Sequence, residues 1–157
     1  MATTLDFYYE VGVYTKNVTV DLTSANIKLA LVTQSYTPDL DNHTVWGDVS
    51  THEVAAGTGY TTGGALLTTP TVSRTAGQSL SVWNADNVQF TGLTKTFKYG
   101  VVYQDETVNG VVKPLIAVID FDDTSTTSDI SVSDAVYSVQ WDASGIWEFG
   151  PVAAICP

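Results

Sequence analysis

The stretch YGVVYQDETVNGVVKPLIAVIDF, residues 99–121, decides the fold class. Its two ends, Tyr99–Tyr103 and Leu115–Phe121, are continuous apolar runs of a length typical of central β-strands. Between them lies Asn109-Gly110, flanked by Val108 and Val111. Asn-Gly is the strongest short-range signal for a hairpin, because both residues tolerate positive φ. The stretch therefore predicts an antiparallel pair of strands at the centre of a sheet.

A second strand signal precedes this stretch. From Asn26 to Thr33 the sequence places Ile27, Leu29 and Leu31 on one side of an extended chain. Lys28 and Ala30 fall on the other side, and this alternation is typical of a half-buried strand.

The rest of the chain is predicted to be short strands and polar loops, with two helical segments. The expected strands are Leu66–Ser73, Ser79–Trp83, Asn87–Thr91 (Val88 and Phe90 inward), Val136–Trp141 and Ile146–Phe149, the last two flanking a turn at Asp142–Gly145. The expected loops are Tyr36–Thr44, Gly57–Gly64 and Asp122–Asp129, and the short helices are Leu5–Tyr14 and Asp48–Val54. This pattern predicts an all-β, mainly antiparallel fold, a β-sandwich or open barrel. We expect one domain over residues 1–149 and a tail over residues 150–157.

The composition agrees with a single β-rich domain. The chain has 157 residues, of which 44% are hydrophobic and 15% charged, against about 25% charged in an ordinary soluble domain. Thr and Val are abundant, and both suit a pleated surface better than a helix.

The charge balance argues against several classes of partner. Six Lys and Arg against 17 Asp and Glu give a net charge of −11, which provides no basic stripe for nucleic acid and no attraction to an anionic membrane. No apolar run approaches the roughly 20 residues of a membrane span, and the first ten residues lack the features of a signal peptide. Cys156 is the only cysteine, so no internal disulfide forms, which fits synthesis in a reducing cytoplasm.

Candidate catalytic residues are few. His52 lies next to Glu53, and serines are frequent, so a hydrolase built on His52 and Glu53 is one hypothesis. No Gly-x-Ser-x-Gly turn accompanies them, and surface or capping roles are favoured for both His43 and His52. We predict that the chain is not an enzyme.

Two acidic clusters and one glycine-rich segment could hold ligands. Asp39 with Asp41, and Asp120 with Asp122 and Asp123, offer oxygens to a hard cation such as Ca²⁺. Both clusters lack EF-hand spacing, and acids at strand ends usually form turns with their own backbone. Gly57–Gly64 lacks the spacing and the following Lys of a phosphate loop, so it is predicted to be a loop with positive φ anchored by Tyr60. No metal site and no cofactor are predicted.

The aromatic residues admit two interpretations. Trp46, Trp83, Trp141 and Trp147, with eight Tyr, could stack on sugars. Aromatic side chains in a sandwich of this size more often belong to the core or to contacts with a partner subunit, and we favour that role.

Several of these segments together resemble small virion proteins of tailed bacteriophages. The resemblance is carried by Asp48–Val54 followed by Gly57–Leu66. Flanking segments agree in order, and the resemblance extends over roughly residues 5 to 149; these segments are Ser24–Val32, a Tyr-Thr-Pro-Asp loop at 36–39, Asn84–Phe90, Lys98–Gln104, Pro114–Asp120, Ile130–Val132, Val139–Asp142 and Ile146–Phe149.

The resemblance implies a structural protein on the phage particle, and we expect a head decoration or cement protein. Such a protein would be made in the host cytoplasm, lie on the outer head surface, and bind the major capsid protein and copies of itself, for instance as a trimer. Contacts are expected from the loops 36–47 and 57–64, from the tail 150–157, and from Phe7, Tyr8, Tyr9, Tyr36, Trp46, Tyr60 and Ile155. The alternative is a tail, adaptor or fibre component that binds host sugars through exposed aromatics beside Asp or Asn.

Overall fold

The computed structural model describes residues 3–9, 20–74, 80–122 and 129–149. Within these ranges every pairing between strands is antiparallel, and the helical structure consists of two short 3₁₀ helices, η1 (Trp46–Asp48) and η2 (Ser50–His52). The chain is therefore an all-β protein with short helical segments, as the sequence predicts. In the part of the chain described, no helix is long and apolar enough to cross a membrane.

Five strands form the central sheet. In sheet order they are β1 (Thr4–Phe7), β10 (Leu115–Asp120), β7 (Tyr99–Gln104), β2 (Ile27–Val32) and β3 (Ala65–Leu66). The two apolar runs of the deciding stretch became β7 and β10, which pair with each other and each have another strand on the far side. This confirms their prediction as central strands.

The hairpin signal between β7 and β10 is also confirmed. β8 (Thr107–Val108) and β9 (Val111–Val112) pair across Asn109 and Gly110. Both turn residues have positive φ, 48° and 89°, the conformation that favours Asn-Gly at this position.

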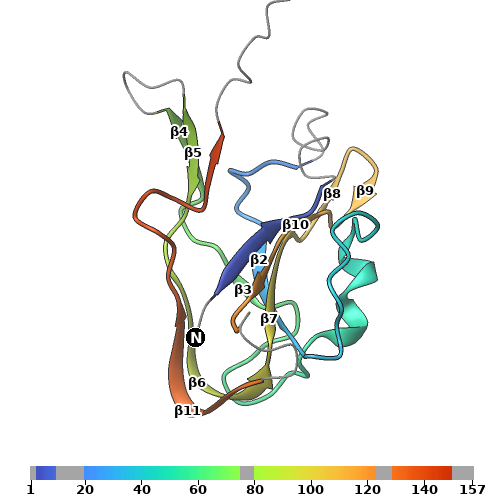
Figure 1. Ribbon diagram of the computed structural model, residues 1–157, viewed down its shortest axis with the longest axis vertical. Coiled ribbons are helices and arrows are strands. Elements are labelled where there is room, and N and C mark those ends of the chain that lie inside the picture. The colour runs from blue at the N-terminus through green and yellow to red at the C-terminus, as the bar shows by residue number, and fades with distance from the viewer. Residues whose placement is uncertain (1–2, 10–19, 75–79, 123–128, 150–157) are drawn as a thin grey trace, which may run out of the picture.

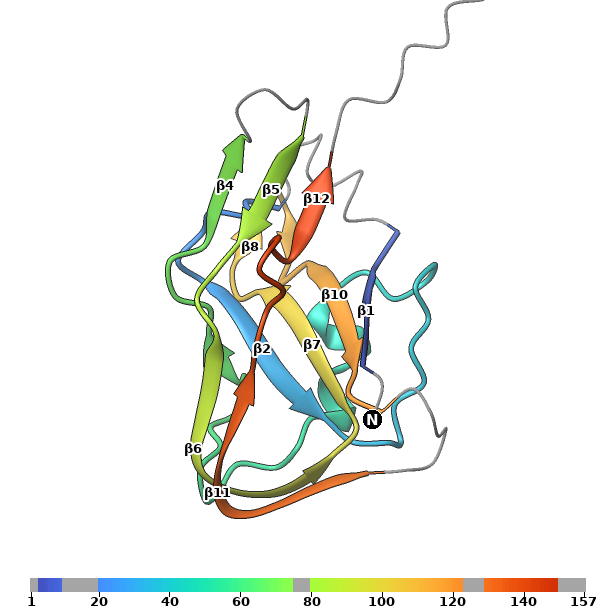
Figure 2. The same ribbon diagram turned by 60° about the vertical axis from the view of Figure 1, so that its left-hand side comes forward.

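A second layer covers one face of the central sheet. It consists of the ribbon of β6 (Val88–Phe97) with β11 (Ile130–Val139), and a three-stranded sheet in which β5 (Ser81–Asn84) lies between β4 (Thr71–Arg74) and β12 (Trp147–Phe149). Figure 1 shows β6 and β11 on one side of the central sheet and the two 3₁₀ helices on the other. Figure 2 shows β4, β5 and β12 together at one end of the molecule.

Side-chain alternation in the central sheet separates two hydrophobic cores. Ile27, Leu29 and Leu31 face the β6–β11 layer, where they join Phe90 and Leu93. The opposite face of the sheet packs on the segment that contains the 3₁₀ helices, and its cluster comprises Tyr8, Ala30, Val32, Tyr36, Trp46, Val49, Val101, Tyr103, Leu115 and Val118.

The prediction that residues 27–32 form a half-buried strand was wrong in one respect. The two faces are assigned correctly, but Ala30 and Val32 are as fully buried as Leu29. The segment after β2 folds back over this face. Thr33 N–H donates a hydrogen bond to His52 C=O, and Val54 N–H donates to Leu31 C=O. A strand covered on both faces carries apolar residues at almost every position.

The helix predicted over Leu5–Tyr14 is not formed in its described part. Residues 4–7 are the edge strand β1, and Tyr8 N–H continues the pairing by donating to Ile116 C=O at 3.1 Å. The exposed edge of β10 offers backbone partners that an isolated segment lacks, so tertiary pairing overrides local preference. Residues 10–14 lie outside the described ranges.

One further expectation needs correction, and another is confirmed. The strand predicted over Leu66–Ser73 is divided between β3 and β4, which belong to different sheets. The turn at Asp142–Gly145 is present, with Gly145 N–H donating to Asp142 C=O at 2.9 Å. Its flanking strands do not pair with each other, because β11 pairs with β6 and β12 with β5.

Candidate interaction site

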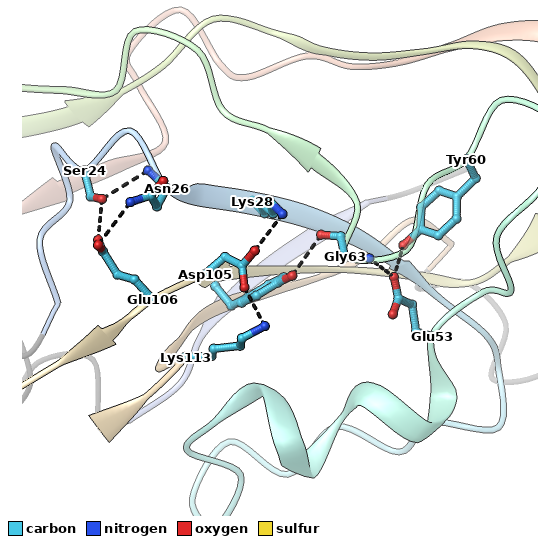
Figure 3. A network of polar contacts seen from close by, with 10 residues as sticks. Ser24, Asn26, Lys28, Glu53, Tyr60, Gly63, Asp105, Glu106 and Lys113 are labelled. Carbon is cyan, nitrogen blue, oxygen red and sulfur yellow. Dashed lines mark hydrogen bonds and ion pairs between the residues drawn. The ribbon is translucent and has the colours of Figure 1, made fainter. Parts of the chain in front are cut away.

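The glycine-rich loop 57–64 is fastened to the central sheet by polar contacts that are buried or partly buried. Glu53 accepts hydrogen bonds from the Tyr60 hydroxyl (2.8 Å) and from Gly63 N–H, and Tyr60 in turn accepts from Leu31 N–H (3.1 Å). The Tyr103 hydroxyl donates to Gly63 C=O at 2.9 Å. Figure 3 shows how Glu53 and Tyr60 hold the loop from one side. The prediction that Tyr60 anchors this loop is confirmed.

A network of charged residues continues along the sheet toward the start of β2 and the end of β7 (Figure 3). Asp105 lies 2.6 Å from the ammonium of Lys28 and 2.7 Å from that of Lys113. Burial alone would raise the pKa of Asp105, but the hydrogen bonds from the two lysines outweigh burial and hold the pKa below its usual range. Glu106 accepts from Ser24 at 2.6 Å. These acids stabilise loop and strand ends.

We predict that Glu53→Ala destabilises the fold measurably. The substitution leaves the Tyr60 hydroxyl and Gly63 N–H without their acceptor, and hydrogen bonds to charged groups contribute roughly 1.5–3 kcal/mol. We expect a loss of about 2–3 kcal/mol in urea unfolding followed by tryptophan fluorescence. Glu148→Ala, an exposed control on β12, should cost about 0.5 kcal/mol or less; equal losses would contradict the anchoring role of Glu53.

Four aromatics predicted as surface contacts belong to the cores of the chain itself. Tyr8, Tyr36, Trp46 and Tyr60 are all buried. The hydroxyl oxygens of Tyr8 and Tyr36 lie 2.7 Å apart, and the Trp46 ring stacks on Tyr103 with centroids 4.3 Å apart. Their prediction as interface residues is corrected here, because side chains packed inside one chain cannot meet a partner.

The remaining predicted contacts differ in position. Phe7 is half-buried and packs on Trp147, with ring centroids 4.7 Å apart. Tyr9 is 66% exposed and is available to a partner. Ile155, with the rest of the tail 150–157, lies outside the described residues.

The buried tyrosines predict a sharp alkaline transition. Burial is the largest cause that raises the pKa of Tyr8, Tyr60 and Tyr103, and it raises the pKa of Tyr137 to about 12. A raised pKa means that stability is fully present below the unfolded value, about 10, and is lost as pH rises toward the folded value. We expect phenolate absorbance and unfolding by circular dichroism to rise together above pH 10. A gradual ionisation with the fold intact would contradict this.

The residues of the hydrolase hypothesis are not assembled as that hypothesis requires. The Glu53 carboxylate is engaged by Tyr60 and Gly63, whereas His52 Nδ1 lies 3.0 Å from Ser35 Oγ. Ser35 is exposed and is also 2.8 Å from Thr33 Oγ1. Among the described residues no carboxylate hydrogen-bonds the His52 ring, so the structure shows a surface Ser–His contact without an orienting acid.

Of the two acidic clusters, the one at Asp39 forms a turn and the one at Asp120 pairs with a lysine. Asp39 Oδ1 accepts from the backbone N–H of Asp41 and Asn42, and hydrogen bonds from Asn42 lower the Asp39 pKa. Asp120 Oδ1 lies 2.9 Å from the ammonium of Lys98. The described residues contain no group of three potential metal ligands.

Lys98 supplies the positive charge at the Asp120 cluster. Its ammonium, almost fully buried, also donates to Asp122 C=O at 2.7 Å. Asp122 N–H donates to Asp120 Oδ1 at 3.0 Å, as expected for an acid at a strand end. Asp123 lies outside the described residues.

An open groove lies between the two layers, beside the edge strand β1. Its volume is about 560 Å³. Apolar side chains from both layers and polar side chains line it: Thr3, Thr4, Leu5, Ile119, Phe121, Tyr137, Ser138, Val139, Gln140, Trp141, Asp142, Gly145 and Ile146. The sequence did not identify this groove, because the strands that border it depend on the pairing order of the sheets.

Comparison with known proteins adds no relative. The chain matches no protein-family model, and no match was found among curated proteins or solved structures.

Proposed function

We propose that the chain is a structural protein of a bacteriophage particle, a head decoration or cement protein. The observation that carries the proposal is the place of the segment that resembles phage virion proteins. Residues 48–66 form one scaffold unit, in which η2 and the glycine-rich loop are joined through Glu53 and fastened to β2 by Tyr60. The residues that carry the resemblance are therefore hydrogen-bonded to one another as one structural unit.

The chemistry of the surface supports this role. Histidine and carboxylate groups that could serve catalysis take part in turns, loop anchors and ion pairs. Large apolar side chains are exposed at Tyr9, Leu66, Val72, Val112 and Val136. A lattice protein needs only weak contacts of this kind, because repetition on a surface multiplies their effect. A net charge of −11 suits the outer side of a head, away from packaged nucleic acid.

The partners of such a protein are the major capsid protein and further copies of this chain. The test is to image purified particles of the phage that encodes it and to identify their proteins by mass spectrometry. We expect the chain in many copies on the outer head lattice. Its absence from the particle, or its restriction to the tail, would overturn the proposal.

A second candidate is a tail or fibre component that binds sugar in the groove. Tyr137, Trp141 and Asp142 line the groove together, which is the combination that this alternative requires. The Tyr137 ring, however, packs edge-to-face on Phe97 and Phe121, so it is not free to stack. Specific binding on a glycan array, lost in Trp141→Ala, would favour this candidate.

A further inference from the structure

The groove is bordered by a strand edge that can accept another strand. β1 is the outermost strand of the central sheet. Because Tyr8 N–H donates to Ile116 C=O, alternation along an antiparallel pair directs the backbone groups of Asp6 and Thr4 toward β10. The N–H and C=O groups of Thr3 and Leu5 then face away from β10, and both residues line the groove.

Apolar side chains form one part of the groove, and the one charged residue among the described residues that line it is an acid. Leu5, Ile119, Phe121, Val139 and Ile146 bring core side chains to its surface. Asp142 is the charged residue among those that line the groove. An extended segment without acidic side chains could pair with the backbone groups that face away from β10, cover the apolar side chains of the groove and avoid repulsion from Asp142.

This chain contains a segment of that chemistry. Residues 150–157, Gly-Pro-Val-Ala-Ala-Ile-Cys-Pro, carry no charged side chain, and four of their residues are Val, Ala or Ile. Val152 and Ala154 alternate with Ala153 and Ile155, so an extended conformation would present two apolar residues to each side. The segment lies outside the described residues, and it begins directly after β12.

The direction of β12 favours a groove on a different molecule. Ile146 lines the groove, and β12 then carries the chain from Trp147 to Phe149 along β5. Figure 2 shows β12 leading away from β11 and the N-terminal end of β1. To enter the groove of its own chain, segment 150–157 would have to reverse the direction of β12. Segment 150–157 of a neighbouring copy need not reverse.

We propose that residues 150–157 of one copy bind as an added strand along β1 in the groove of a neighbouring copy. This strand exchange rests on the proposed assembly of the chain into oligomers, and it identifies the contact that holds the copies together. The exchange joins chains through main-chain hydrogen bonds and one apolar strip, the usual mode of strand addition to a sheet edge. It also removes an open sheet edge, a hazard for uncontrolled pairing.

Disulfide trapping tests the contact in the full chain, because Cys156 is its only cysteine. Thr3→Cys and Gln140→Cys place a second thiol at two points of the groove. After mild oxidation we expect at least one variant to give covalent dimers and longer chains on a non-reducing gel. The matched control Val112→Cys, exposed on β9, should stay at background, as should each groove variant combined with Cys156→Ser.

The other outcomes are equally informative. A disulfide within one chain would place the segment in its own groove and overturn the exchange. The absence of cross-links from both groove positions, or equal cross-linking of Val112→Cys, would also overturn it.

The oligomeric state gives an independent measurement. Light scattering should show an oligomer for the full chain and a monomer for a chain that ends at Phe149. A monomeric full chain, or an oligomer that persists after truncation, would contradict the proposal. All these experiments use the purified protein, so they can fail while the head location is confirmed, or succeed on a protein that belongs to the tail.

Discussion

Replacing Gly64 by alanine is expected to cost about 4 kcal/mol or more, enough to leave little folded protein. Gly64 has a φ of +81°, and a Cβ at this position would lie 2.1 Å from Leu29 O and 2.6 Å from Ala30 Cα. Both neighbours are backbone atoms of β2, a strand that is buried at every position except Lys28, so neither can move aside. The loss compares with a typical total stability of 5–15 kcal/mol.

Gly110→Ala is the matched control for Gly64→Ala. Gly110 has a similar φ of +89°, but a Cβ there would meet nothing within 4 Å. Its cost is therefore the conformational strain alone, roughly 1–2 kcal/mol. Urea unfolding of both variants separates the steric clash from the strain. Equal losses would show that loop 57–64 can move away from β2, which contradicts the anchoring by Glu53 and Tyr60.

The parts of the fold that the sequence predicts are those set by local rules. The hairpin at Asn109-Gly110 follows from the tolerance of both residues for positive φ. The strands over Tyr99–Tyr103 and Leu115–Phe121 follow from apolar runs that suit a position between other strands. The inward direction of Val88 and Phe90 follows from simple alternation, and both are buried.

The parts that the sequence does not predict depend on contacts between distant segments. β1 is a strand because β10 lies beside it. The local sequence Thr4–Phe7 does not predict that pairing. Trp46 is buried because it stacks on Tyr103, which lies far along the chain. An aromatic residue in a core and one in an interface have the same local sequence signal, so the predicted contacts at Tyr8, Tyr36, Trp46 and Tyr60 could not be separated from core positions.

The acidic residues also depend on a contact that the local sequence does not predict. The second prediction with a large expected effect concerns this contact, between Asp120 and Lys98. Asp120 and Asp122 have the spacing of cation ligands, and the structure places a cation there as the side chain of Lys98. A carboxylate that meets a lysine from another part of the chain cannot be distinguished from a metal ligand without the fold.

Lys98→Met is expected to cost about 3 kcal/mol. The Lys98 side chain is 1% exposed and binds Asp120 Oδ1 at 2.9 Å and Asp122 C=O at 2.7 Å. Removing one member of a buried pair typically costs 3–5 kcal/mol, because the other charge is left without compensation. Since the Asp120 side chain is 23% exposed, water can partly solvate its carboxylate, and we expect the lower end of this range.

Lys113→Met provides the control for Lys98→Met. Lys113 lies 2.7 Å from Asp105, but it is 43% exposed, and Asp105 keeps Lys28 as a second partner. Such an exposed pair contributes about 1 kcal/mol or less.

The double variant Lys98→Met/Asp120→Asn then separates the ion pair with Asp120 from the other hydrogen bond of the Lys98 ammonium. The amide carries no charge to be left uncompensated, so we expect part of the loss to be recovered, with a coupling of roughly 1–3 kcal/mol in urea unfolding. If the two single losses simply add, the hydrogen bond from the Lys98 ammonium to Asp122 C=O, rather than its pairing with Asp120, stabilises the corner between β7 and β10.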